Sequence, residues 1–103
     1  MFYTKGRGCE ARGFYSSNGF TVLKGSVIAK ISAPSLKWGD KRNRLISDYT
    51  TIEGGKLVMT SDKTFSSPST AADFCIGSSN NGWIVWKDVD GNTLDSVYRK
   101  QLE

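Results

Sequence analysis

The central hairpin of this chain is encoded by residues 9–31, CEARGFYSSNGFTVLKGSVIAKI. Residues 9–16 predict a strand, and Asn18-Gly19 predicts the turn after it, because both residues tolerate a positive φ. Residues 20–31 predict a long return strand. Gly25-Ser26 lies inside that strand and predicts a bulge or a bend. A sheet built from hairpins is therefore expected.

A helix is predicted over residues 40–51, with Asp40 as its N-cap. Leu45, Ile46 and Tyr49 share its apolar face. The charged residues that lie largely on other faces are Lys41, Arg42, Arg44 and Asp48. This distribution is typical of a helix that packs on a core along one side.

A second hairpin and a second helix follow. Gly54-Gly55 predicts the hairpin turn, and residues 56–60, KLVMT, predict its return strand. The second helix is predicted over residues 68–76, with Ser67 as its cap and Pro68 at its first position, where the missing N–H costs nothing. The apolar side of this helix and its stop signal are formed by Ala71, Ala72, Cys75, Ile76 and Gly77.

The last third of the chain predicts short elements. Residues 83–87, WIVWK, predict a strand, so Trp83 and Trp86 should point to opposite faces, and at most one should be fully buried unless both faces are covered. Asp90-Gly91 predicts a turn. A short final helix is marked by Leu94, Val97 and Tyr98.

Length and composition favour one α+β domain. The chain has 103 residues, of which 38% are hydrophobic, a composition typical of a globular domain. We expect a small mixed sheet of hairpins with two or three short helices. Residues 1–10 are expected to be an N-terminal extension, residues 11–100 a single accessory domain, and residues 101–103 a tail that resembles a cloning remnant.

The expected location is the cytoplasm. No apolar run approaches the ~18 residues of a membrane span, and residues 1–13 lack the apolar segment of a secretion signal. Cys9 and Cys75 are too few for a disulfide-stabilised secreted domain, so we expect both to be reduced.

The sequence argues against catalysis, because it contains no histidine. Ser-His-Asp and Cys-His mechanisms are excluded, and two cysteines alone cannot fill a structural zinc site. Asp88-x-Asp90-Gly91 is similar to the start of a calcium loop, but the glycine comes too early and the distal glutamate is missing. We therefore expect a protein with no enzyme activity, no cofactor and no metal.

Positive charge is concentrated in the first half of the chain. Residues 1–51 carry nine Lys/Arg and three Asp/Glu, whereas residues 52–103 carry five and seven. The densest part spans residues 37–44, and its candidate ligand-binding residues are Lys37, Trp38, Lys41, Arg42 and Arg44. Cations neutralise phosphates and an exposed indole can stack on a base. The alternative is a solvated helix face with Trp38 folded into the core.

Residues 65–87 hold a second group of candidates. The predicted start of the second helix presents backbone N–H groups beside three serines, a geometry that suits anions. Simple helix capping is the alternative. The candidates here are Ser66, Ser67 and Ser69 at the helix start, and Asn80 and Asn81 in the loop before the tryptophans.

The run FSSPSTAADFCIGSSNNGWIVWKDVDGNTLDSV, residues 65–97, resembles a bacterial domain of unknown function found C-terminal to catalytic modules in many GIY-YIG nuclease-family proteins. Residues 11–26, ARGFYSSNGFTVLKGS, resemble the hairpin of the same domain. The C-terminal part is also similar to the restriction-enzyme and adenine-methylase-associated domain. The resemblance implies a small α+β accessory domain that aids DNA engagement, although this chain has no GIY and YIG tripeptides.

Two functions are consistent with these features. The first is a nucleic-acid-binding accessory module, with DNA as the expected partner, beside a nuclease domain in the same or another chain. The second is a protein-interaction module that docks onto a partner enzyme through aromatic anchors. Binding that weakens steeply with salt would separate the first from the second.

Overall fold

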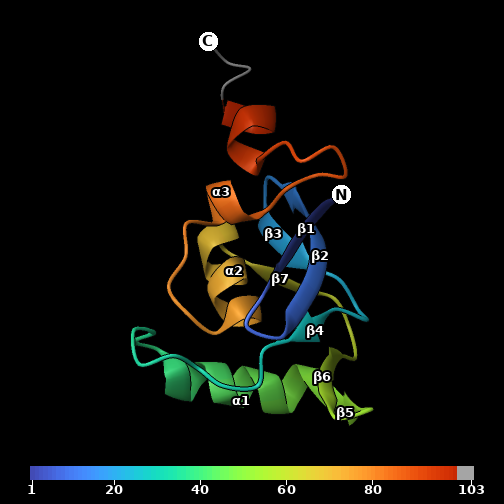
Figure 1. The fold of residues 1–103 in the computed structure, drawn as a ribbon, viewed down its shortest axis with the longest axis vertical. Helices are drawn as coiled ribbons and strands as arrows, with labels where there is room; N and C mark the ends of the chain where they lie inside the picture. The colour runs from blue at the N-terminus through green and yellow to red at the C-terminus, as the bar shows by residue number, and fades with distance from the viewer. Residues whose placement is uncertain (100–103) are drawn as a thin grey trace.

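Strand β2 (Cys9–Ser16) is the centre of an antiparallel sheet in the computed structural model, which describes residues 1–99 (Figure 1). The strands lie in the order β5-β6-β4-β2-β3-β7, and β1 pairs with β2 outside this path. Their bounds are β1 Phe2–Gly6, β3 Gly19–Val22, β4 Val27–Ile28, β5 Thr50–Glu53, β6 Lys56–Met59 and β7 Lys63–Phe65. The α+β class is confirmed. The sequence predicted a mixed sheet, and within residues 1–99 the six strand pairings are all antiparallel.

The sequence predicted a bulge or a bend at Gly25-Ser26, and the structure has a turn there that divides the long return strand into β3 and β4. Gly25 has φ +90°, and its N–H donates to the Met59 carbonyl at 2.9 Å. The Ser26 hydroxyl accepts the Arg12 N–H at 3.1 Å. Before this turn β3 pairs with β7, and after it β4 pairs with β6, so the two halves of the return strand join different parts of the sheet.

Within the expected N-terminal extension, Phe2–Gly6 form β1, and Cys9 and Glu10 begin β2. Phe2 pairs with Gly13 at one end of β1, and Gly6 pairs with Cys9 at the other. Phe2 is buried in the core, and Tyr3 exchanges two backbone hydrogen bonds with Lys87. Sequence reasoning missed β1 because its short FYTKG pattern is too brief to show alternation.

Helix α2 (Pro68–Ile76) covers the concave side of the sheet and is confirmed where it was predicted (Figure 1). The Ser67 hydroxyl accepts the Thr70 N–H at 3.1 Å, and Gly77 ends the helix with φ +79°. Ala71 and Ala72 are completely buried, so the helix can approach the strands closely.

Helix α1 (Gly39–Tyr49) lies across one end of the molecule (Figure 1). It is the predicted helix, but Trp38 occupies the cap position without a side-chain cap bond, and Asp40 lies in the first turn. Thr50 and Thr51, expected in the helix, begin β5 instead, which suits their β-branched side chains. The hairpin at Gly54-Gly55 is confirmed between β5 and β6.

The predicted strand over residues 83–87 is wrong. Gly82–Val85 form a single helical turn, α3, and Asn81 Oδ1 accepts the Trp83 N–H at 3.1 Å. A Cβ at Gly82 would lie 2.2 Å from the backbone of Pro68, so α3 packs directly against the start of α2. This tertiary contact overrides the strand preference of the WIVWK run. Lys87 forms only isolated bridges, with Tyr3 and Thr93.

Trp86 is the large residue at the centre of the core. It is fully buried, its ring stacks on Phe20 with 4.2 Å between centroids, and its Nε1 donates to the Pro68 carbonyl at 3.0 Å. Trp83 is half-buried, so one tryptophan of the pair is fully buried, as expected.

The end of the described chain forms a π-helical turn, η1 (Asp95–Arg99), near the predicted final helix. Leu94, immediately before it, is fully buried. The predicted tail at residues 101–103 lies outside the described residues. Within residues 1–99, no helix has both the length and the apolar character needed to cross a bilayer.

Candidate functional site

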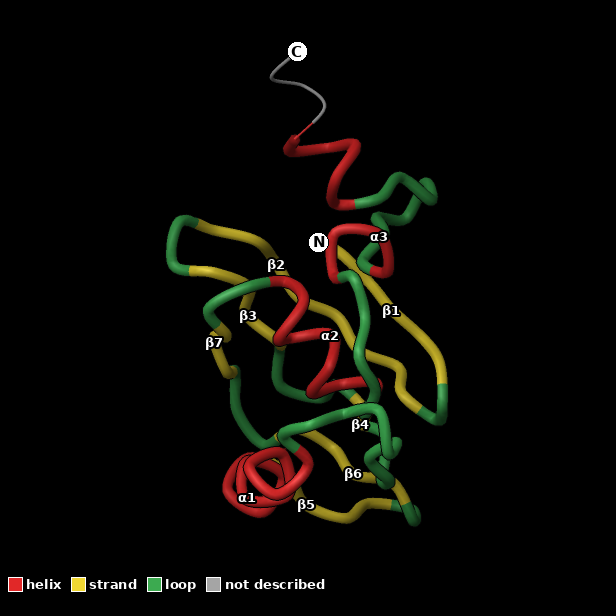
Figure 2. Tube along the Cα trace, turned by 90° about the vertical axis from the view of Figure 1, so that its left-hand side faces the viewer, coloured by secondary structure: helices red, strands yellow, loops and turns green. Residues whose placement is uncertain are grey.

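Two distant groups of predicted site residues meet in one hollow of about 440 Å³, which we call the α1–β7 groove. Trp38 and Lys41 come from the start of α1, and Ser66 follows β7. The other lining residues are Leu45, Lys63, Thr64, Phe65 and Thr70. Figure 2 shows α1 end-on beneath β7 and α2, the three elements that supply these side chains.

Lys63 is a groove residue that sequence reasoning missed. Its Nζ lies 5.5 Å from the centroid of the Tyr49 ring and 5.6 Å from that of Phe65, so two aromatic faces position the ammonium group. Lys41 is exposed on α1. The part of the chain that the structure describes contributes no carboxylate to the groove lining. The groove therefore offers two ammonium groups and several hydroxyls to an anion.

Trp38 is half-buried at the edge of this groove and packs against the core. Burial raises the pKa of Asp73 above its usual value, and hydrogen bonds from the Asn80 backbone N–H and the Trp38 side chain partly offset that rise. The sequence left open whether Trp38 is exposed for stacking or folded into the core. In the structure Trp38 does both, because part of the indole packs inward while part lines the groove.

The prediction that Arg42 is a ligand-binding residue is wrong, because its side chain is completely buried and cannot reach a phosphate. Its Nε donates to the Phe74 carbonyl at 2.7 Å, and its two terminal nitrogens donate to Ser32 Oγ at 3.1 Å and the Ala29 carbonyl at 2.5 Å. The guanidinium therefore joins the segment after β4 to the C-terminal turn of α2, where carbonyl groups favour a cation.

A sequence signal for the burial of Arg42 was present. Counting from Arg42, Leu45, Ile46 and Tyr49 follow at i+3, i+4 and i+7, which places all four side chains on one helical face. The charge of Arg42 masked this periodicity.

Lys37 and Arg44 are exposed beside the groove but do not line it. The two ion pairs found within residues 1–99 are Lys5–Glu10 and Asp95–Arg99, so the exposed cations of α1 have no carboxylate within 4 Å. These residues extend a positive surface from the groove along the helix.

The remaining predicted polar residues are already hydrogen-bonded within the fold. Ser67 caps α2, and Ser69 Oγ accepts the Gly82 N–H at 3.0 Å. Asn80 Nδ2 donates to the Ser78 carbonyl at 2.8 Å, and Asn81 caps α3. These side chains hold α2, α3 and their loop in place, whereas Ser66 is exposed and lines the groove.

The two cysteines, far apart in sequence, lie together in the core. Both are free thiols and both are buried. A hydrogen bond with Cys75 lowers the pKa of Cys9, whereas burial raises the pKa of Cys75. The two thiols therefore form part of the packing between β2 and α2.

The protein is a small α+β domain in which an antiparallel sheet packs around the core helix α2. The cationic groove between α1, β7 and the N-terminal part of α2 is its candidate binding surface. The chain belongs to the family described as Domain of unknown function (DUF4357), which matches residues 2–98. The matched region includes β1, in agreement with its place in the sheet. No curated protein and no solved structure matches the chain.

Proposed function

We propose that this domain is a non-catalytic accessory module that binds nucleic acid, in particular DNA, through the α1–β7 groove. One observation carries the proposal. Trp38 and Lys41 from one segment and Ser66 from another line a single groove, together with Lys63.

The groove offers the chemistry that single-stranded nucleic acid needs. Ammonium groups neutralise backbone phosphates and release counterions, while an indole edge accepts a stacked base. Lys41 and Lys63 would contact phosphates, Trp38 would stack, and Ser66 would donate a hydrogen bond to a phosphate oxygen. Lys37 and Arg44 would extend the contact along α1.

The partner arrangement is also part of the proposal. The resemblance of residues 65–97 to domains that accompany nuclease and modification enzymes supports a role beside such an enzyme, in the same or another chain. A bacterial source and a cytoplasmic location, both expected from the sequence, fit this role.

The alternative is a module that docks onto a partner enzyme, and one observation favours it. Tyr3, Ile84 and Val89 are exposed by 38%, 48% and 81%, and all three line a separate hollow of about 700 Å³. Exposed apolar side chains that gather in one place are typical of a protein-binding surface.

The test is a titration of labelled single- and double-stranded DNA at two salt concentrations, with wild-type protein and a Lys41→Gln/Lys63→Gln variant. We expect the variant to bind all DNA sequences more weakly and to flatten the log–log salt slope by roughly one to two units, since each lost phosphate contact removes ~0.7–0.9. A Lys24→Gln/Lys87→Gln variant, which removes the same charge from exposed residues outside the groove, is the matched control.

If the groove variant and the wild type bind DNA equally well, the α1–β7 groove is not the DNA-binding site. If the wild type binds no DNA, the protein-docking alternative takes its place.

A further inference from the structure

We propose that a second hollow, which we call the basic pocket, binds an organic anion that carries a carboxylate or a monophosphate on an aliphatic body. The basic pocket has a volume of about 490 Å³ and shares no lining residue with the α1–β7 groove. Figure 2 shows the turn between β1 and β2, at the edge of this pocket, on the opposite side of α2 from β7. This site is independent of the proposed function.

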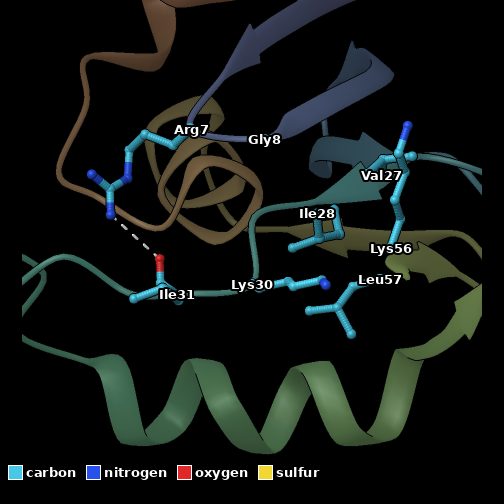
Figure 3. Close-up of a pocket in the computed structure, with 8 residues that line it drawn as sticks. All are labelled: Arg7, Gly8, Val27, Ile28, Lys30, Ile31, Lys56 and Leu57. Atoms are coloured by element: carbon cyan, nitrogen blue, oxygen red, sulfur yellow. Dashed lines mark hydrogen bonds between the residues drawn. The ribbon is translucent and has the colours of Figure 1, made fainter. Parts of the chain in front are cut away.

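Three cations from three separate segments line the basic pocket, with Lys30 between Arg7 at one end and Lys56 at the other (Figure 3). Arg7 lies in the turn between β1 and β2, Lys30 follows β4, and Lys56 begins β6. All three are exposed, and neither ion pair within residues 1–99 includes any of them. The presence of three cations along one hollow, with no acidic side chain among the described lining residues, gives it a positive potential that favours an anion.

The floor of the basic pocket is aliphatic. Ile28 is 1% exposed and lies in the core, Leu57 is half-buried, and Ile31 is 74% exposed at the rim. The described lining includes no aromatic ring, so bases have no stacking platform there. An apolar surface with a few placed charges, within a volume of several hundred Å³, is typical of a small-molecule site. The aliphatic floor selects the body of the ligand and the cations select its anionic group.

The position of Arg7 is a further sign that its side chain is used. Among residues 1–99 it is the only residue other than glycine with a positive φ, +53°, and it lies between Gly6 at +147° and Gly8 at +86°. Two-residue hairpin turns with positive φ favour Asn-Gly or Asp-Gly, so arginine occupies this position against the local preference. At one end of the pocket, Arg7 Nη2 donates to the Ile31 carbonyl at 3.5 Å, a long hydrogen bond that a ligand can readily replace (Figure 3).

The test is a titration of isotope-labelled protein with hexanoate and with hexyl phosphate, followed by NMR, with hexanol and hexylammonium as matched probes without negative charge. We expect both anions, but not the two controls, to shift the backbone amide signals of Val27, Ile28, Ile31 and Leu57. Arg7→Asn places a residue that the turn favours, so the variant should fold while an Arg7→Asn/Lys30→Gln/Lys56→Gln variant binds hexyl phosphate roughly tenfold more weakly.

Shifts of equal size with hexanol, no shifts with either anion, or unchanged affinity in the triple variant would overturn the proposal. DNA binding through the groove should be unaffected by Arg7→Asn, so failure of one site is distinguishable from failure of the other. If the wild-type protein cosediments with phosphatidylglycerol vesicles and the triple variant does not, the anion is a lipid headgroup. Hexyl phosphate binding without cosedimentation would assign it to a free organic anion.

Discussion

The α1–β7 groove and the basic pocket both gather cations, but the surfaces between those cations are different. In the groove, Lys63 lies over two aromatic rings and Trp38 forms one edge. In the basic pocket, Arg7 and Lys56 stand around an aliphatic floor. We propose that the positive charge of each surface favours an anion, and that the neighbouring side chains determine which kind of anion binds.

Arg42 is a buried cation that lines neither surface. Its guanidinium donates to the Ala29 carbonyl, next in sequence to Lys30 of the basic pocket, and to the Phe74 carbonyl of α2, the helix that contributes Thr70 to the groove. We expect Arg42→Gln to destabilise the fold by ~2–5 kcal/mol, because three hydrogen bonds from a buried charged group are lost. Urea unfolding measures the change.

Arg44→Gln is the control for that experiment, because it removes the same charge two residues away at an exposed position. Its effect should stay within ~0.5 kcal/mol. If the Arg42 and Arg44 variants have the same free energy of unfolding, the buried hydrogen bonds of Arg42 do not stabilise the fold.

Helix α2 lies between β7, beside the groove, and the β1–β2 turn, at the edge of the basic pocket (Figure 2). Ala72 is completely buried against the sheet, so Ala72→Leu should overpack this contact and cost ~1–3 kcal/mol. The same enlargement at exposed Asn43, Asn43→Leu, should leave the melting temperature nearly unchanged. Thermal unfolding compares the two, and a wild-type melting temperature for Ala72→Leu would mean that α2 is not packed as described.

Trp38 should distinguish the ligands of the two surfaces. Trp38→Leu keeps an apolar side chain but removes the stacking surface, so we expect DNA binding to weaken by ~1–3 kcal/mol. Trp38→Phe keeps a ring and should retain most of the affinity. Hexyl phosphate binding at the basic pocket should be the same in both variants, and a parallel loss there would mean that the surfaces are coupled.

The smallest expected effect concerns pH and Asp73, which lies beside Trp38 of the groove. Because burial raises the pKa of Asp73, the folded protein holds this proton more tightly than the unfolded chain does. Its contribution to stability therefore increases as pH falls from the folded-state pKa towards the unfolded value of 3.8. Relative to Asp73→Asn, the wild type should gain stability over that acidic range in urea unfolding.

Asp88 provides a control of opposite sign. The Asn92 backbone N–H lowers the pKa of Asp88, so its contribution is present above the unfolded-state value and is lost as pH falls through the folded-state pKa. Relative to Asp88→Asn, the wild type should lose stability on acidification. The same direction of change for both aspartates would contradict this assignment.

The elements that could be predicted from the sequence are those with local chemical signals. Ser67, Pro68 and Gly77 mark both ends of α2 through capping and backbone geometry. The hairpin around Asn18-Gly19 forms as expected, although its turn is centred one residue earlier, on Ser17-Asn18. Such signals act within a few residues and need no tertiary contact.

The features that could not be predicted depend on contacts between distant segments. The helical turn at Gly82 exists because it packs on Pro68, and Lys63 becomes a groove residue because β7 brings it to Tyr49. Of the predicted site residues, Trp38, Lys41 and Ser66 line the groove, but only the fold brings them together. The spacing of residues along the chain does not show which distant residues the fold brings into contact.

The sheet topology also has a consequence for the order of folding. Three hairpins close over two-residue turns, whereas β3 and β7 meet across a long intervening segment, with Thr21 and Thr64 43 residues apart. Loop-closure entropy opposes that last pairing most, so we expect the hairpins to form early and the β3–β7 pairing to complete the folding nucleus. Stopped-flow refolding of Thr64→Ala should then show slower folding, and a change confined to the unfolding rate would place this pairing after the transition state.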